Sequence, residues 1–165
     1  MQKGSARDVV KFLISNEKTI ATAESCTAGL IAATIGDFPG VSAVFNEGFI
    51  TYSNEAKEKI LGVPHELLEK HGAVSHEVCQ AMAEGVCART GADIGIATTG
   101  IAGPDGGTKE KPVGLVYIGF SVYGKTTVYK YIFSGNRNKV RAHTVLCAFH
   151  QLKKLLKKQL TNVKN

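Results

Sequence analysis

Apolar and polar positions along the chain follow two different periods, which predicts strands and helices in turn. Short apolar runs with β-branched residues, bounded by turn residues, are typical of buried strands. Such runs cover residues 19–23, 42–52, 92–99, 113–122 and 126–133. The last two flank Tyr123-Gly124-Lys125 and predict an antiparallel hairpin.

Segments between these runs have apolar residues spaced three to four apart, as in amphipathic helices. Capping residues, prolines or glycines mark several of their ends. The predicted helices cover residues 5–14, 27–35, 54–61, 64–72, 75–91 and about 137–160. Strands that mostly alternate with helices predict one α/β domain over residues 1–165. We expect a three-layer α/β/α sandwich with a mixed, mostly parallel sheet and one antiparallel hairpin.

Composition narrows the class of protein. The 165 residues are 44% hydrophobic and 21% charged, as in ordinary globular domains. No run of about 18 apolar residues occurs, and the first residues lack the apolar core of a signal peptide, so we expect a cytoplasmic protein without a membrane partner. The four cysteines have no CxxC spacing, which argues against a zinc site or a disulfide framework. The net charge of +6 permits an anionic partner.

The first candidate for chemistry is Glu24-Ser25-Cys26-Thr27, between a predicted strand and a predicted helix. Backbone N–H groups at a helix N-terminus are unpaired, so they can donate hydrogen bonds to negative charge that develops during a reaction. A hydroxyl or thiol at this turn would therefore be well placed to act as a nucleophile. Alternatively, Ser25 or Thr27 only caps the helix. Residue chemistry alone does not decide whether Ser25 or Cys26 would be the nucleophile, because a thiol is also activated at a helix N-terminus.

The second candidate is Lys57. If Asn54 caps the following helix, Lys57 lies in its first turn, where the macrodipole disfavours a cation. Burial beside Tyr52 would also favour the neutral amine, which could act as a general base with the Tyr52 phenol relaying or positioning the proton. Alternatively, Lys57 is a solvated residue on a surface helix.

The third candidate is the loop at residues 100–107, which contains four glycines, one proline and one aspartate. Its backbone could approach a ligand closely. The loop matches neither the dinucleotide-binding nor the Walker pattern, and it could also be a long connection between strands.

The fourth candidate is the pair Arg137 and Arg141. They are four residues apart near the start of the last predicted helix, so they share one face. With the helix N–H groups they could clamp a phosphate, although such a pair is also common on solvated faces.

In this order the four segments resemble the C-terminal domain of the CinA (competence/damage-inducible) family. The resemblance rests on AESCTAGL, GFITYSNEAK, GAVSHEV, TTGIAGPDGG, PVGLVYIG and FSGNRNKVR, and covers nearly the whole chain. The stand-alone form of this family is a nicotinamide-nucleotide amidase. The resemblance therefore implies hydrolysis of nicotinamide mononucleotide to nicotinic acid mononucleotide and ammonia, without a metal or cofactor. The nucleotide-processing domain of longer members is not present in this sequence.

The resemblance also implies roles for individual residues. Ser25 would be the nucleophile, Lys57 the general base and Tyr52 its neighbour in the proton network. Thr27 and nearby backbone N–H groups would face the oxyanion. The residues that would hold the nucleotide are Gly100, Ala102, Gly103, Asp105, Gly106, Arg137 and Arg141. One departure is Ala28, where many members carry glycine.

Two other functions compete with the amidase. A nucleic-acid or protein-binding module is favoured by the charge and the basic KKLLKK segment, but this segment lacks the aromatic residues that stack on bases, so we expect no nucleic-acid partner. A non-catalytic nucleotide binder would keep the pocket without turnover. For either enzyme or binder we expect a homodimer or a higher homo-oligomer.

Overall fold

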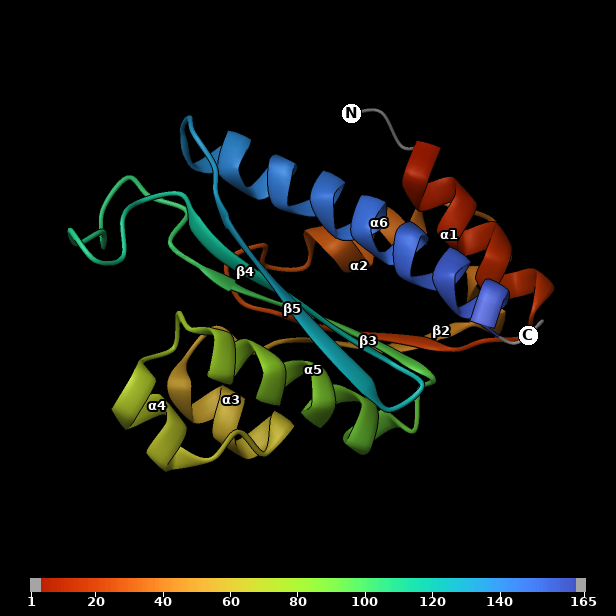
Figure 1. Cartoon of the computed structure of the whole chain (residues 1–165), viewed down its shortest axis with the longest axis horizontal. Helices are drawn as coiled ribbons and strands as arrows, with labels where there is room; N and C mark the ends of the chain where they lie inside the picture. The colour runs from red at the N-terminus through yellow and green to blue at the C-terminus, as the bar shows by residue number, and fades with distance from the viewer. Residues whose placement is uncertain (1–3, 163–165) are drawn as a thin grey trace.

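A five-stranded sheet lies between two layers of helices (Figure 1). The computed structural model describes residues 4–162, with side chains up to residue 158. The strands are β1 (Ile20–Glu24), β2 (Phe45–Ile50), β3 (Ile94–Gly100), β4 (Leu115–Val122) and β5 (Lys125–Ile132). The helices are α1 (Gly4–Ser15), α2 (Leu30–Gly36), the 3-10 helix η1 (Val41–Ala43), α3 (Asn54–Leu61), α4 (His65–His71), α5 (His76–Thr90) and α6 (Arg137–Asn162). No helix within residues 4–162 is long and apolar enough to cross a membrane.

The strand order is β2-β1-β3-β4-β5. β1 is parallel to both β2 and β3, whereas β4 is antiparallel to both β3 and β5. Four strands therefore share one direction, and β4 alone runs against them. This confirms the predicted mixed, mostly parallel sheet, three-layer sandwich and terminal hairpin.

Each helical layer has its own core because residues alternate between the two faces of the central strands. β3 presents Ile94 and Ile96 to α1, α2 and α6, and Ala97 to α3, α4 and α5. Small residues on the second face let α5 pack close to the sheet. A side chain at Gly95 would meet the carbonyl oxygen of Ala83 at 2.7 Å, which explains why glycine occupies this position.

Sheet topology places the C-terminal ends of β1 and β3 at a point where the chain changes direction. From β1 the chain passes through α2 to β2 on one side, whereas β3 joins β1 on the other side after α3, α4 and α5. Open α/β sheets bind their ligands outside the carboxyl ends of the strands at such a switch point. Because Glu24 pairs with Thr98, the residues after Glu24 lie beside the end of β3.

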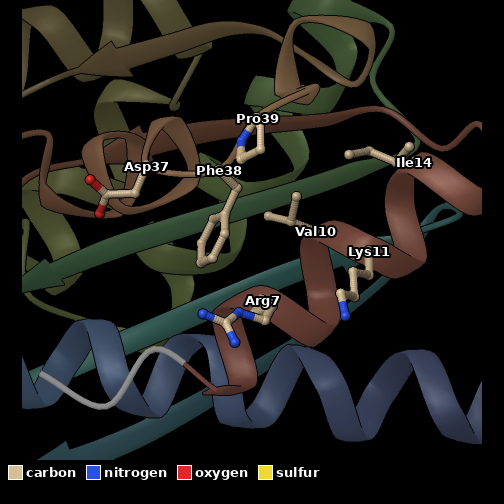
Figure 2. A pocket seen from close by; sticks show the side chains of 7 residues that line it. All are labelled: Arg7, Val10, Lys11, Ile14, Asp37, Phe38 and Pro39. Carbon is tan, nitrogen blue, oxygen red and sulfur yellow. The ribbon is translucent and has the colours of Figure 1, made fainter.

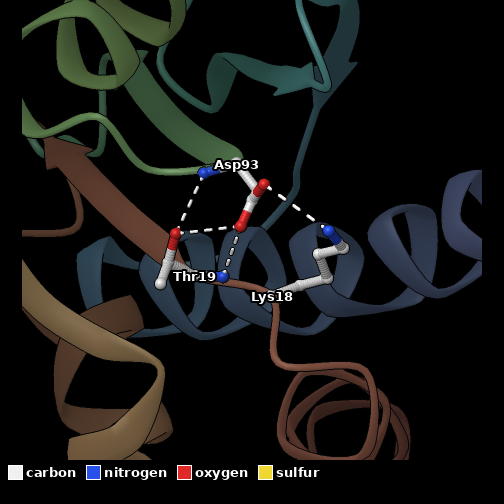
Figure 3. A network of polar contacts seen from close by, with 3 residues as sticks. All are labelled: Lys18, Thr19 and Asp93. Carbon is white, nitrogen blue, oxygen red and sulfur yellow. Dashed lines mark hydrogen bonds and ion pairs between the residues drawn. The ribbon is translucent and has the colours of Figure 1, made fainter.

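At the opposite end, where β1 and β3 begin, Asp93 ties the two strands together (Figure 3). Its carboxylate accepts hydrogen bonds from the Thr19 backbone N–H at 2.9 Å and from the Thr19 hydroxyl at 3.1 Å. The Thr19 hydroxyl oxygen accepts in turn from the Asp93 N–H, and the Lys18 ammonium lies 3.9 Å from the same carboxylate. This network fixes the register of the two strands far from the ends that carry the candidate residues.

Two predicted boundaries are wrong. The helix expected over residues 27–35 begins only at Leu30, because Ala28 (φ 49°) and Gly29 (φ 88°) have left-handed backbone conformations that a helix does not admit. The strand expected over residues 42–52 is split into η1 and the shorter β2.

Candidate active site

Ser25 directly follows β1 in a turn. Its backbone N–H donates to the carbonyl oxygen of Thr98 at 3.0 Å, which fixes the start of the turn against β3. The side chain is mostly enclosed, with 8% of the residue exposed. Its Oγ lies 3.3 Å from the Nζ of Lys57. The structure thus brings together the two residues that the sequence suggests as nucleophile and base.

Lys57 is a buried lysine, with only 1% of the residue exposed. Of the two residues expected to supply the cap, Ser53 and Asn54, it is Ser53 that caps α3: its Oγ accepts from the Ala56 N–H at 3.1 Å. Lys57 remains near the positive end of the helix. Burial lowers the pKa of its amine, with a smaller opposing effect from Glu55. This environment excludes the alternative of a solvated surface lysine.

The Lys57 amine is held by main-chain carbonyl groups. Its Nζ lies 2.9 Å from the oxygen of Thr51, 3.1 Å from that of Tyr52 and 3.5 Å from that of Ser53. A neutral amine has two N–H donors and one lone pair. When the two nearest carbonyls accept the two N–H bonds, the lone pair remains for the Ser25 hydroxyl. This is the arrangement that a general base for a serine nucleophile requires.

The Cys26 thiol belongs to the hydrophobic core on the side of α1, α2 and α6. Burial raises its pKa to about 12, so the thiolate is scarce near neutral pH. The structure therefore separates Ser25 from Cys26, which the sequence alone does not: the Ser25 hydroxyl meets the Lys57 amine, and the Cys26 side chain is buried in the core.

The backbone N–H groups at the start of α2 are already occupied. The Glu24 carboxylate accepts from Ile31 N at 3.0 Å and from Ala32 N at 2.8 Å. The expectation that helix N–H groups face the reacting hydroxyl is therefore wrong at α2. The N–H groups of Cys26 and Thr27, in the turn itself, donate to no other residue that the structure describes. Glu24 belongs to the first candidate segment, but the sequence pattern assigns it no role of its own, although an acidic residue shortly before a helix is a recognisable capping signal.

Thr27 is fully buried, and its hydroxyl lies 2.8 Å from the hydroxyl of Thr98. This pair joins the Ser25 turn to β3. The Thr27 hydroxyl is thus paired with Thr98, and the group through which Thr27 could bind a ligand is its backbone N–H.

Tyr52 lies with Arg137 rather than with Lys57. Tyr52 is 53% exposed, and its phenol oxygen accepts a hydrogen bond from Arg137 Nη2 at 2.8 Å. Arg137 Nη1 donates to the carbonyl oxygen of Gly103 at 2.9 Å. Lys57 contacts only the backbone carbonyl of Tyr52. The expected proton relay through the phenol is therefore not formed, and Arg137 instead links Tyr52 to the glycine-rich loop.

Arg141 reaches the Ser25 turn. Its Nη2 donates to the carbonyl oxygen of Thr27 at 2.9 Å, while its Nε is buried without a partner. The two arginines thus contact different segments from one face of α6, Arg137 at the glycine-rich loop and Arg141 at the nucleophile turn. Arg141 therefore brings positive charge to the turn, and Arg137 brings it to the glycine-rich loop and Tyr52.

The remaining predicted residues of the glycine-rich loop are less directly connected to Ser25 and Lys57. Ala102 is buried in the core, and Gly100 is the last residue of β3. Asp105 and Gly106 are exposed, and no hydrogen bond in the described part of the chain joins them to Ser25 or Lys57.

A separate pocket lies at the other end of α2, between α1 and the turn that follows α2 (Figure 2). Ser25 precedes the first residue of α2, whereas this pocket is next to the last. None of the predicted site residues lines it. Its lining residues are Arg7, Val10, Lys11, Ile14, Asp37, Phe38 and Pro39.

Known proteins of one family are similar to this chain over most of its length. The CinA C-terminal domain family matches residues 2–156. A competence-damage inducible protein of Clostridium novyi is 56% identical over 146 residues, and one of Caldanaerobacter subterraneus is 54% identical over 148 residues. These alignments cover 88% and 90% of this chain, but the chain spans only 35% and 36% of the length of those relatives.

Solved structures share the fold over nearly their whole length. The competence damage-inducible protein A of Klebsiella pneumoniae superposes with a TM-score of 0.90 at 37% identity, covering 93% of this chain and 95% of that one. The competence/damage inducible protein CihA of Agrobacterium tumefaciens gives 0.90 at 39% identity, with 93% and 94% covered. The chain therefore belongs to the CinA C-terminal domain family.

Proposed function

We propose that this chain is an amidase that hydrolyses the carboxamide of nicotinamide mononucleotide, with Ser25 as nucleophile and Lys57 as general base. The observation that carries the proposal is the 3.3 Å contact between Lys57 Nζ and Ser25 Oγ in a buried setting. A lysine amine with a lowered pKa beside a serine hydroxyl is the pairing that activates serine without a histidine.

The reaction proceeds in two steps. Neutral Lys57 takes the Ser25 proton while Oγ attacks the carboxamide carbon, and the resulting ammonium gives that proton to the departing ammonia as the C–N bond breaks. Water then attacks the Ser25 ester, Lys57 takes a proton from the water, and returning it to Oγ releases the carboxylic acid. The N–H groups of Cys26 and Thr27, which donate to no other described residue, are among the donors available to the oxyanion in both steps.

The phosphate of the substrate is assigned to the arginines of α6. Arg137 is exposed and its present partners, the Tyr52 phenol and the Gly103 carbonyl, are both neutral, so a phosphate would be a stronger acceptor. Arg141 adds charge from the side of the Ser25 turn. The uncharged carboxamide would then lie between the phosphate anchor and Ser25.

A comparison of three substrates tests this assignment. Nicotinamide mononucleotide, nicotinamide riboside and free nicotinamide would be incubated with the purified chain, and the acids formed would be separated by chromatography. We expect the mononucleotide to give the highest kcat/KM. Equal rates with the riboside would contradict the phosphate assignment, and the absence of any acid product from all three would contradict the amidase.

A further inference from the structure

Glu24 has an unusual environment for a carboxylate. It is fully buried, and among the described residues Glu24 and Lys57 are the two charged side chains that are buried. Both carboxylate oxygens accept backbone N–H groups, from Ile31 and from Ala32. Hydrogen bonds to an ionised acceptor are stronger than neutral ones, so the Glu24 side chain holds the start of α2 firmly against the end of β1.

The backbone of Glu24 also takes part in hydrogen bonds around Ser25 and Lys57. Its carbonyl oxygen accepts from the Thr51 N–H at 2.9 Å, and the Thr51 carbonyl in turn accepts from Lys57 Nζ at 2.9 Å. Lys57 Nζ contacts the hydroxyl of Ser25, the residue next to Glu24. The contacts form a closed ring through Glu24, Thr51, Lys57 and Ser25, and the Glu24 side chain anchors that ring to α2.

The shape of the intervening turn depends on this anchor. Between Glu24 and α2 the chain reverses through Ala28 and Gly29, both with positive φ. If the Glu24 carboxylate did not fix α2, the turn could relax and the first N–H groups of α2 would be free to bind an anion in its place. With them occupied, the N–H groups of Cys26, Thr27 and Gly29 are the ones in the turn that donate to no other described residue.

We infer that Glu24 is a positioning residue for the reaction at Ser25. Its carboxylate fixes the turn of residues 25–29 so that the Ser25 hydroxyl meets the Lys57 amine and the turn N–H groups remain available to the oxyanion. This inference rests on the proposed amidase function, and it adds a residue whose contribution is made through Ser25 and not through contact with the substrate.

The test compares Glu24→Gln with a chemically matched control, Asp93→Asn. Each replaces a carboxylate that accepts backbone N–H groups next to the same pair of strands, but Asp93 acts at the far end from Ser25. We expect both variants to melt at lower temperature than the wild type. Only Glu24→Gln should lose activity, with kcat falling about 100-fold, as for a reacting group displaced by about 1 Å. KM should remain within about twofold, because Arg137, the phosphate anchor, contacts Tyr52 and Gly103 and not the turn.

A second variant, Glu24→Asp, keeps the charge but shortens the side chain by one methylene, so it withdraws the carboxylate from the α2 amides. It should lose kcat as Glu24→Gln does, which separates position from charge. The inference would be overturned if folded Glu24→Gln and Glu24→Asp both kept the wild-type kcat. It would also be overturned if Asp93→Asn lost as much kcat as Glu24→Gln.

A readout that does not need amide turnover keeps this inference distinct from the proposed function. A fluorophosphonate probe reacts when Ser25 Oγ bonds to phosphorus, fluoride leaves and Lys57 takes the hydroxyl proton, and mass spectrometry locates the label. Labelling of wild-type Ser25 without release of ammonia would refute the proposed function alone. Labelling of Glu24→Gln at the wild-type rate would refute the role of Glu24 alone, and no labelling of wild-type Ser25 would refute both.

Discussion

The Nζ of Lys57 lies 3.3 Å from the Oγ of Ser25, although 32 residues separate them in the chain. Ser25 is fixed by the end of β1 and Lys57 by the first turns of α3, and the carbonyls of Thr51 and Tyr52 orient the amine between them. Burial lowers the pKa of Lys57, so this contact joins a hydroxyl to an amine that gives up its proton more readily than an exposed lysine does.

The first prediction concerns the pH dependence of activity. Because the pKa of Lys57 is lowered below its usual value of 10.5, the neutral amine becomes available at a correspondingly lower pH. Activity should be lost at acid pH, where Lys57 is protonated, and kcat/KM should rise with pH through the lowered pKa. The measurement is kcat/KM across pH 5–10 for the wild type and for Lys57→Arg. The arginine variant should be inactive throughout, since a guanidinium does not deprotonate in this range. A wild-type kcat/KM that still rises at pH 10 without levelling off would indicate an amine with an ordinary pKa and would contradict this role for Lys57.

The second prediction concerns the Cys26 thiol. With its pKa raised to about 12 by burial, Cys26 should resist a thiol reagent in the folded protein and react once the chain is unfolded. Labelling at pH 8 followed by peptide mass spectrometry measures this for each cysteine. Rapid reaction of Cys26 with the reagent in the native protein would show that its side chain is not in the core. The half-buried Cys147 should label faster than Cys26 and serves as the internal comparison.

The third prediction concerns Ala28, whose backbone has φ 49° in the Ser25 turn. A left-handed conformation costs a residue with a Cβ about 1–2 kcal/mol, and glycine avoids that cost. Ala28→Gly should therefore raise the free energy of unfolding by about 1 kcal/mol, after allowing for the greater entropy of glycine in the unfolded chain. Urea denaturation measures the change. Ala33→Gly, at an exposed position inside α2, is the matched control and should instead destabilise.

The sign of the Ala28 effect decides the interpretation. Destabilisation by Ala28→Gly, similar to that of Ala33→Gly, would show that residue 28 is not strained.

The fourth prediction concerns Arg137 as the phosphate anchor. Arg137→Gln removes the guanidinium that links Tyr52 to Gly103. Loss of one charge-assisted contact is worth about 1.5–3 kcal/mol, so KM for nicotinamide mononucleotide should rise by about 10- to 100-fold. Nicotinamide riboside, without the phosphate, should be converted by the variant as by the wild type.

The control for Arg137→Gln is Lys139→Gln, which removes an exposed positive charge from the same turn of α6. It should change KM by less than about twofold, because a surface charge in water is well screened. Equal effects of the two variants would show that net charge, and not Arg137, attracts the substrate.

Much of the fold follows from the sequence pattern. Alternating strand and helix periods predict the layers, and Tyr123-Gly124-Lys125 marks the hairpin between β4 and β5. The predicted element boundaries that are wrong depend on local backbone conformation. Nothing in the sequence indicates that Ala28 takes a positive φ, so the pattern predicts a helix that begins at residue 27, three residues before the observed start of α2 at Leu30.

The site was predicted less completely, because its contacts depend on strand register. The pairing of Glu24 with Thr98 sets where the Ser25 turn meets β3, and it brings Thr27 to Thr98 across 71 residues. No periodicity encodes such a contact. For the same reason the sequence could not decide which of Ser25 and Cys26 faces the amine, nor show that Tyr52 would lie against Arg137.

Release of ammonia from nicotinamide mononucleotide by the purified wild type, Ser25→Ala and Cys26→Ala tests the proposed amidase most directly. We expect turnover by the wild type and by Cys26→Ala, and none above background by Ser25→Ala, with all three folded by circular dichroism. Turnover that survives in Ser25→Ala, or that is lost in Cys26→Ala alone, would contradict the assignment of the nucleophile. No turnover by the folded wild type would contradict the amidase itself.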